Sequence, residues 1–234
     1  MFLVVLGLGA PAEAWWRASH EAVARIAYGR LTAQTQSRFR LVLGEALDFG
    51  KIGSWADDVK KERAQTGPWH YIGLPLNAQE GSAALDLACP GGNCVTDQIK
   101  AQMEILADPK ATDLQKKEAL LFLCHLAGDL AQPLHCADDN DRGGNGKAVK
   151  YLGDKMNLHS LWDSALEGEQ DRRGEELAKR LMPKINQKKA RDWLQGGVED
   201  WTWEAHRLAV RVVYPDYRNG LIQAGGYAKL RRSV

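Results

Sequence analysis

Histidine and aspartate side chains recur at helical spacing inside strongly apolar stretches of the sequence. In the segment HLAGDLAQPLH, His125 and Asp129 are four residues apart, and His135 follows a proline that ends the helical pattern. His159 and Asp163 repeat this spacing in HSLWD. Residues four apart lie on one face of a helix, about 6 Å apart along its axis. One such pair is typical of a side-chain hydrogen bond, but two pairs and a third histidine favour a metal such as zinc, which takes nitrogen and oxygen ligands.

The remaining histidines differ in the partners that the sequence offers them. His20 lies five residues after Trp15, the residue predicted to begin the mature chain, whose free amine and carbonyl could chelate a metal. His70, in PWHYIG, could be matched by Asp57 from SWADD. His206 has no acidic residue at ligand spacing and is predicted to lie on a helix surface.

These residues fall within short motifs that together resemble one known family. The motifs are Trp15 with His20, SWAD at 54–57, WHYI at 69–72, HLAGDLAQPLH at 125–135, RGGN at 142–145 and HSLWD at 159–163. In this order and over this span, the chain resembles a bacterial-type secreted member of the zinc-dependent single-strand-specific nucleases, the S-one/P-one family. The resemblance implies an all-α, single-domain helical bundle of the phospholipase C and single-strand nuclease type, with three zinc ions at the base of a cleft.

The resemblance also implies which residues bind each zinc ion. The first would be bound by Asp57, His70, His125 and Asp129. The second would be bound by the amine and carbonyl of Trp15, by His20 and by the other oxygen of Asp129. The third would be bound by His135, His159 and Asp163 and would keep positions open for water and substrate. On this basis Asp57 and Asp129 are expected to act in catalysis as well as in metal binding.

The activity implied is hydrolysis of phosphodiester bonds in single-stranded DNA or RNA. Paired zinc ions can stabilise an attacking hydroxide at neutral pH, and we expect the third ion to stabilise the 3′-oxygen as it leaves. The products would be 5′-phosphorylated fragments, and a 3′-nucleotidase activity on mononucleotides is a further expectation.

Three residues are expected to contact the substrate. Lys60, one helical turn after Asp57, is a candidate catalytic residue that neutralises transition-state charge, with a solvated lysine of the run KKER as the alternative. Asn145 in RGGN would orient the phosphate or base, with a plain turn as the alternative. Tyr71 is a candidate stacking platform for a base, with core packing as the alternative. Many family members have an aspartate two positions later, where this chain has Gly73, so base preference is left open.

Helical periodicity must position these side chains, because it extends over nearly the whole chain. We expect helices at 19–31 with Ser19 as N-cap, at 32–44 from a Thr32 cap to Gly44, around 54–63 up to the Gly67-Pro68 pair, at 95–108, at 112–132 up to Pro133, and at 159–168, 174–195, 198–214 and 219–232. No convincing period-two alternation indicates a strand, and residues 136–154 are predicted to form a loop over one face. These patterns predict one all-α domain over residues 15–234.

The N-terminal segment MFLVVLGLGAPAEA is apolar and ends in an A-x-A pattern, which predicts a secretory signal over residues 1–14, cleaved before Trp15. A truncated apolar strand or helix is the alternative. We therefore expect a secreted or periplasmic protein. No later apolar run is long and uncharged enough to span a bilayer. The net charge of +1 gives no basic field that would hold duplex nucleic acid non-specifically, so a polyanion must be bound locally.

The four cysteines suit an exported chain. Cys89 and Cys94 lie in the tight loop CPGGNC and are predicted to form a surface disulfide. A zinc site made of all four cysteines is the alternative, but Cys124 and Cys136 lack the usual C-x2-C spacing. Cys124 is predicted to be a buried small hydrophobe, and no role is assigned to Cys136.

Two other functions remain open for the same residues. Zinc-dependent phospholipase C shares the implied fold, but the RGGN loop and Lys60 favour nucleic acid, and no apolar stripe suited to bilayer docking is evident. A zinc-binding protein without catalysis is the second alternative, against which the open third site argues. The expected partner is a single-stranded nucleic acid or nucleotide, with no stable membrane association and a monomeric state.

Overall fold

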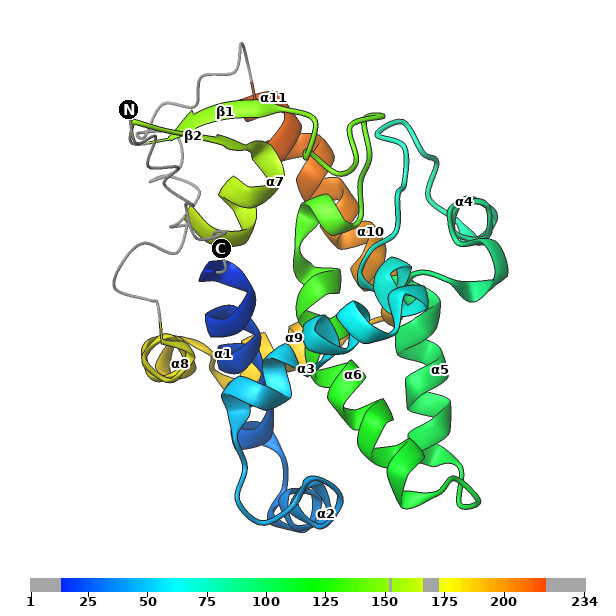
Figure 1. Ribbon diagram of the computed structural model, residues 1–234, viewed down its shortest axis with the longest axis vertical. Helices are drawn as coiled ribbons and strands as arrows, with labels where there is room; N and C mark the ends of the chain where they lie inside the picture. The colour runs from blue at the N-terminus through cyan, green and yellow to red at the C-terminus, as the bar shows by residue number, and fades with distance from the viewer. Residues whose placement is uncertain (1–13, 152, 166–172, 218–234) are drawn as a thin grey trace, which may run out of the picture.

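The computed structural model describes residues 14–151, 153–165 and 173–217, which are arranged mainly as helices (Figure 1). The α-helices are α1 (Ala14–Arg30), α2 (Ala33–Leu43), α3 (Phe49–Glu62), α4 (Ser82–Ala88), α5 (Val95–Ala107), α6 (Asp113–Ala131), α7 (Leu158–Ser160), α8 (Gly174–Leu181), α9 (Gln187–Trp193), α10 (Val198–Leu208) and α11 (Tyr214–Asp216). Short 3₁₀ segments lie at Ala64–His70, Pro90–Gly92, Pro133–His135 and Met182–Lys184, and π-helical turns at Leu161–Ala165 and Ala209–Val213. The all-α class is confirmed.

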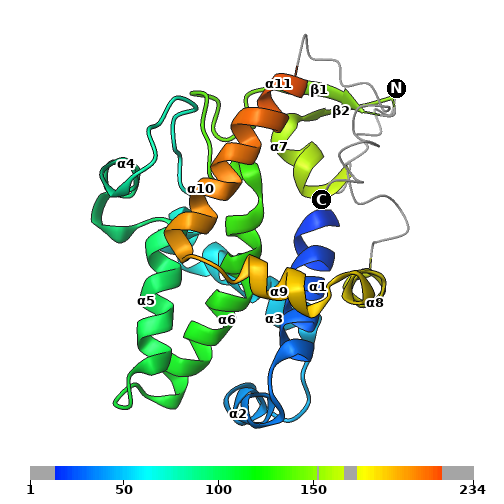
Figure 2. The ribbon, with the colours of Figure 1, turned by 180° about the vertical axis from the view of Figure 1, so that it is seen from behind.

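Helix α6 passes through the centre of the molecule and carries the first histidine–aspartate pair (Figure 1). Helices α1 and α3 pack against one side of it and α5 against the other, while α10 contacts both α5 and α6 (Figure 2). The largest apolar cluster joins α3, α5, α6 and α10 and includes Ala56, Val95, Leu126 and Trp203. The site residues on α3 and α6 therefore come from helices that share this core.

The ends of α6 follow from its sequence. At its start the Thr112 hydroxyl accepts a hydrogen bond from the backbone N–H of Gln115, and the Gln115 side chain accepts one from the backbone of Thr112. At its end Pro133 cannot continue the helix, and the chain turns through Pro133–His135. This turn returns His135 toward the helix it has just left. The helices predicted at 95–108 and 112–132 are confirmed within a residue of each end.

Other predicted helices differ from the structure in their ends. Ser19 is not an N-cap, because α1 already begins at Ala14 and runs through it. The Thr32 cap is confirmed, since its side chain accepts a hydrogen bond from Thr35. Helix α3 starts earlier than predicted and ends at Glu62, before the glycine–proline pair, and Pro68 lies inside the following 3₁₀ segment. A proline is tolerated there because its missing N–H and fixed φ suit a short turn.

Two segments were predicted wrongly. Residues 136–154 are not only a loop, because β1 (Ala148–Tyr151) pairs antiparallel with β2 (Asp154–Asn157) in a small hairpin. Four-residue strands are too short for a convincing alternating pattern in sequence. The helix expected at 174–195 is broken into α8, a 3₁₀ turn around Pro183, and α9, because proline removes a helical hydrogen bond. The pattern at 198–214 continues as α10, a π-helical turn and α11.

The predicted segments at both ends of the chain lie outside the described residues. These are the signal segment 1–14, of which only Ala14 is described, and the helix expected at 219–232. Among the described residues, no helix has the length and apolar character needed to cross a membrane.

The predicted disulfide between Cys89 and Cys94 is present. A four-cysteine zinc site is therefore excluded, since this pair is oxidised and Cys124 and Cys136 remain as separate thiols. Cys124 packs half-buried beside Phe39 and Ile52, and burial raises its pKa to about 12, so it behaves as the small hydrophobe expected. Cys136 is fully buried in the main apolar cluster.

Candidate metal centre and substrate pocket

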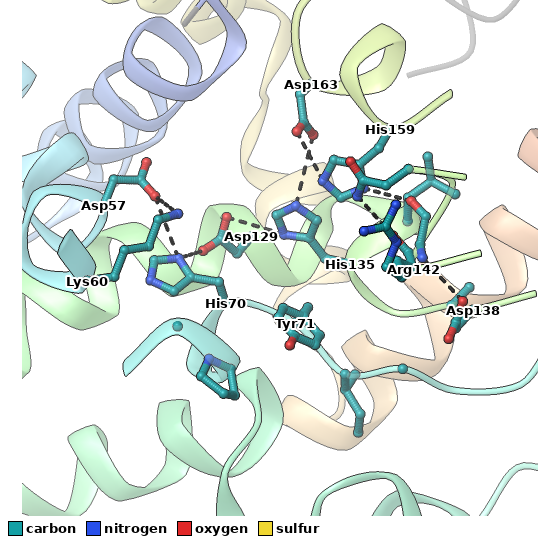
Figure 3. Close-up of a pocket in the computed structure, with 18 of the residues that line it drawn as sticks. Asp57, Lys60, His70, Tyr71, Asp129, His135, Asp138, Arg142, His159 and Asp163 are labelled. Atoms are coloured by element: carbon teal, nitrogen blue, oxygen red, sulfur yellow. Dashed lines mark hydrogen bonds and ion pairs between the residues drawn. The ribbon is translucent and has the colours of Figure 1, made fainter. Parts of the chain in front are cut away.

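The carboxylate of Asp129 is the point on which the histidines converge (Figure 3). Its Oδ2 lies 2.8 Å from Nδ1 of His70 and 3.0 Å from Nε2 of His125. Its Oδ1 lies 3.3 Å from Nδ1 of His135 and 3.4 Å from Nε2 of His20. Asp129 is 3% exposed. A buried carboxylate surrounded by imidazole nitrogens from α1, α6 and two 3₁₀ turns has the position expected of a bridging ligand.

The first group of donors joins α3, the segment Ala64–His70 and α6. Oδ1 of Asp57 lies 3.7 Å from Nε2 of His125 and 3.9 Å from Nδ1 of His70. The other ring nitrogen of His125 is 2.6 Å from the carbonyl oxygen of Gly53. That backbone acceptor fixes the proton on Nδ1 and turns Nε2 toward the carboxylates, as in metal-binding histidines. The predicted residues of the first zinc site are thus brought together.

His20 enters the site from α1, where it is buried directly against α6. Its ring stacks on His125 with centroids 3.8 Å apart and planes 17° apart. A Cβ atom added to Gly128 would lie only 2.7 Å from Nδ1 of His20, so glycine is required for this approach. Trp15 lies in the first turn of α1.

The third group lies at the other end of the pocket, on α7, the adjoining π-helical turn and the 3₁₀ segment Pro133–His135. Nε2 of His159 lies 3.2 Å from Oδ2 of Asp163, and Nε2 of His135 lies 3.9 Å from Oδ1 of the same carboxylate. Nδ1 of His159 lies 2.7 Å from the carbonyl oxygen of Gly143. The amide of Gln132 donates a 2.7 Å hydrogen bond to Oδ1 of Asp163. The His159 and Asp163 side chains are therefore each oriented by a second partner behind them.

Electrostatics keep the carboxylates ionised. Burial would raise the pKa of Asp129, but the His125 and His135 imidazoles outweigh burial and hold it well below its usual value. The pKa of Asp163 is lowered in the same way, since His159 and His135 outweigh burial. The pKa of Asp57 is also lowered, as His125 and Lys60 outweigh burial. All three carboxylates can therefore bind a cation at neutral pH.

The pKa values of the imidazoles shift in different directions, because burial and the neighbouring carboxylate charges oppose each other to different extents. Burial lowers the pKa of both His20 and His70, which favours the neutral form that a metal requires. Burial also acts on His125, but the charge of Asp129 outweighs it and raises the pKa to about 9. The pKa of His159 is raised because the hydrogen bond and charge of Asp163 outweigh burial.

A metal ion fits these residues on the geometry alone. His70 Nδ1 and His125 Nε2 face each other at 3.1 Å beside one carboxylate oxygen, a contact that needs a shared proton or cation. His135 Nδ1 is buried, and although Oδ1 of Asp129 lies 3.3 Å away, no well-aligned hydrogen bond reaches it within the described residues. Donor atoms lie within 4.8 Å of one another in three groups of histidine and aspartate. These groups are His20–His125–Asp129, Asp57–His70–His125 and His135–His159–Asp163.

One pocket of about 670 Å³ is lined by all of these donors except the fully buried His125, and by the predicted substrate-binding residues. Lys60 lines it from α3, with Nζ 2.5 Å from Oδ1 of Asp57, so it is part of the site and not a solvated surface lysine. Tyr71 is 51% exposed at the pocket, which excludes core packing. Gly73 lines the same wall, and a Cβ placed there would lie 3.8 Å from Cβ of Asp138.

Asn145 also lines the pocket, but its side chain already has a partner. Nδ2 donates a 2.9 Å hydrogen bond to the carbonyl oxygen of Arg142. The loop that carries it is not a plain turn, since Gly143 supplies the carbonyl that orients His159. Both glycines of RGGN have positive φ angles, 61° for Gly143 and 84° for Gly144, which favours glycine at these positions.

The comparisons with known proteins agree with this geometry. The family model described as S1/P1 Nuclease matches residues 15–234. The chain belongs to the S1/P1 nuclease family. Relatives include Endonuclease 2 of Arabidopsis thaliana, 33% identical over 64% of this chain and 55% of its own length, and Nuclease S1 of Aspergillus oryzae, 32% identical over 64% and 53%. Nuclease P1 of Penicillium citrinum is 27% identical over 86% of this chain and 82% of its own. The matched region thus spans about half the length of the first two relatives.

Several residues of this S1/P1 family site were not predicted from the sequence. Gln132 orients Asp163 from inside the HLAGDLAQPLH motif, where a polar residue next to a proline was the available signal. Gly53 acts through its backbone oxygen and Gly128 through the absence of a side chain. A single sequence does not distinguish such glycines from others, so neither role could be predicted. His206 was predicted wrongly as a surface residue. It is 4% exposed, and its Nε2 lies 3.0 Å from the carbonyl oxygen of Pro75.

Proposed function

We propose that this S1/P1 family protein is a zinc-dependent endonuclease that hydrolyses phosphodiester bonds of single-stranded nucleic acid, leaving 5′-phosphorylated fragments. The observation that carries the proposal is that all three histidine–aspartate groups open into one pocket together with a lysine and an exposed tyrosine. Structural zinc sites are closed by four protein ligands, whereas this donor set is open to a pocket that can admit a substrate. A non-catalytic zinc protein would have no use for that opening.

The protein's own residues would hold three zinc ions in the arrangement expected from the sequence. Asp57, His70, His125 and Asp129 would bind the first, and His135, His159 and Asp163 the third. His20 and Asp129, with the amine and carbonyl of Trp15 after cleavage of the leader, would bind the second. When bound, the ions would lower the pKa of water and neutralise charge on the phosphodiester oxygens. The hydrogen bonds from His125 to Gly53 and from His159 to Gly143 would keep the ring nitrogens aimed at the ions.

Lys60 would stabilise negative charge on the phosphate as it is attacked. Its ammonium is held at one end of the donor row by Asp57, so it is positioned before the substrate arrives (Figure 3). An ammonium keeps the positive charge of an arginine but lacks the planar fork that binds two oxygens at once. We therefore expect Lys60 to act as a point charge on one non-bridging oxygen.

Tyr71 would provide the preference for single strands. Its exposed ring lies immediately after the ligand His70 and lines the pocket, so a base stacked on it would place the adjoining phosphate near the donors. A base in a duplex is already paired and stacked, and it cannot reach the ring without being unpaired. A mononucleotide with a 3′-phosphate could stack in the same way, which would give 3′-nucleotidase activity.

The decisive experiment compares substrates with zinc supplied and after chelation. The purified protein should release acid-soluble nucleotides from single-stranded DNA much faster than from duplex DNA, and a chelator should abolish this. Tyr71→Ala should lower kcat/KM on single strands about tenfold, the value of one lost base stack. Trp193→Ala is the matched control, because Trp193 is similarly exposed on α9 but does not line the pocket. Phosphocholine release from lecithin without nucleotide release would instead identify a phospholipase C, and no hydrolysis of either substrate would leave only a binding protein.

Three further parts of the proposal need measurements on the mature protein. We expect about three zinc ions per chain, with Trp15 as the first residue after export. Metal analysis and N-terminal sequencing test both, since a chain beginning elsewhere could not form the amine and carbonyl chelate. Light scattering should give the mass of a monomer.

A further inference from the structure

Arg142 is held at the pocket in a conformation that non-glycine residues rarely adopt. Its φ angle is 60°, in the left-handed region. Its carbonyl oxygen accepts the hydrogen bond from Asn145 described above. The carboxylate of Asp138 accepts hydrogen bonds from the backbone N–H groups of Asp141 and Gly143, at 2.9 and 3.3 Å. The backbone on both sides of Arg142 is therefore fixed by the protein.

A second carboxylate anchors the same loop to the body of the molecule. Oδ1 of Asp141 accepts 2.9 Å hydrogen bonds from the backbone N–H of Gly144 and from the hydroxyl of Tyr214. Residues in strained backbone conformations persist only where the surroundings over-determine them, and they gather at functional sites. The loop thus presents the side chain of Arg142 from a rigid support.

The charge of Arg142 is available in a way that the neighbouring cations are not. Lys60 is paired with Asp57, and Lys147 is 2.8 Å from a carboxylate oxygen of Asp139. Within residues 14–151, 153–165 and 173–217, by contrast, the guanidinium of Arg142 has no ion pair or hydrogen bond, although it is exposed and lines the pocket. Figure 3 places Arg142 beside His159, at the opposite end of the donor row from Lys60.

We propose that Arg142 binds the phosphate of the nucleotide next to the cleaved linkage. This inference rests on the proposed function, because it assigns a second contact to the same polynucleotide substrate. A strand whose scissile phosphate lies over the donors must leave the pocket at its ends, and one end passes Arg142. A guanidinium presents a planar fork that matches two phosphate oxygens, and an exposed cation with no acidic partner lacks any competing anion. Asn145 then acts as a positioning residue, which holds the backbone of Arg142.

Short substrates separate this contact from the chemistry itself. The dinucleoside monophosphate TpT has only the linkage to be cleaved, whereas TpTpT adds one flanking phosphate. Arg142→Gln should leave kcat/KM on TpT unchanged and should lower it about tenfold on TpTpT, corresponding to about 1.4 kcal/mol, mainly through a higher KM. Arg142→Lys should fall between the two, because it keeps the charge but loses the fork. Lys117→Gln is the control, since Lys117 is an exposed cation in the first half of α6 that does not line the pocket.

A neutral linkage gives a second and independent readout. In two forms of TpTpT, either the first or the second phosphodiester is replaced by a methylphosphonate, so that only the other linkage is cleaved. In one of the two forms, the neutral linkage should lower kcat/KM of the wild-type enzyme by the same factor by which Arg142→Gln lowers it on unmodified TpTpT. In that form, the neutral linkage should not lower kcat/KM of Arg142→Gln any further. Zinc content should be equal in all proteins.

The outcomes separate the inference from the function on which it rests. If Arg142→Gln lowers kcat/KM equally on TpT and TpTpT, or on neither, the flanking contact is overturned while the nuclease activity remains in place. The flanking contact is also overturned if, in both forms, Arg142→Gln and the neutral linkage each lower kcat/KM and their effects add. If the wild-type protein with zinc cleaves neither substrate, both the proposed function and this inference fail.

Discussion

Gly128 offers a way to disturb the proposed metal centre without removing any of its proposed ligands. It lies in α6 next to Asp129, and a Cβ atom there would lie 2.7 Å from Nδ1 and 2.9 Å from Cε1 of His20. The His20 ring has no room to move toward His125, because it already stacks on that ring with centroids 3.8 Å apart. Gly128→Ala therefore forces a displacement of one ligand.

The size of that displacement predicts the size of the effect. Relieving a 2.7 Å contact to the 3.4 Å of ordinary van der Waals contact moves Nδ1 by about 0.7 Å. Metal–ligand distances tolerate only about 0.2 Å, so the site that uses His20 should lose its ion. A misplacement approaching 1 Å typically costs about 100-fold in rate, and we expect kcat to fall by about this factor. The stability of α6 itself should not fall, since alanine is favoured over glycine in a helix interior by about 1 kcal/mol.

The assay measures zinc content and the rate of single-strand cleavage on the same preparation. Gly128→Ala should lose about one zinc ion per chain and keep its helical circular dichroism. Gly67→Ala is the matched control, because Gly67 lines the same pocket but a Cβ there would meet nothing within 4 Å. If Gly128→Ala keeps its full zinc content and rate, or if the control loses as much, the close approach of His20 to α6 is not what positions this ligand.

Three other predictions follow from the same geometry. Asp129→Ala should abolish activity and lower zinc content from about three ions to about one, because the first two proposed zinc sites share Asp129 and only the His135–His159–Asp163 group keeps all of its ligands. An active variant would refute the bridging assignment. Replacing Cys89 and Cys94 together by serine should lower the free energy of unfolding by about 2 kcal/mol in denaturant titrations, while zinc content stays constant. Tyr214→Phe should cost about 2 kcal/mol at pH 7, because the hydroxyl donates to the ionised Asp141. Burial would raise the pKa of Asp141, but hydrogen bonds from Gly144 and Tyr214 hold it below its usual value, so this contribution is complete above about pH 4 and is lost as the pH falls further. A Tyr214→Phe difference that persists unchanged at low pH would contradict that reasoning.

Local patterns in the sequence determined much of the structure around the site. The His125–Asp129 and His159–Asp163 pairs meet at 3.0 and 3.2 Å, as four-residue spacing predicts. The Thr112 cap and Pro133 fixed both ends of α6, and the short Cys89–Cys94 loop formed its disulfide. These features depend on neighbours within a few residues in the chain, and helix geometry and loop closure act over that same range.

Long-range packing decided the rest, because it joins segments that no local pattern connects. Only the folded chain shows that Asp129 lies within 3.4 Å of nitrogens from four histidines on separate elements. The same holds for Gly53, which orients His125 across 72 positions, and for His206, buried by its contact with Pro75. The strands at 148–157 are stabilised by pairing with each other and by packing on the apolar cluster around Leu158. The sequence alone therefore determined which residues are able to bind metal, and the tertiary structure decided which of them share a carboxylate, because shared ligands require close contact between helices distant in the chain.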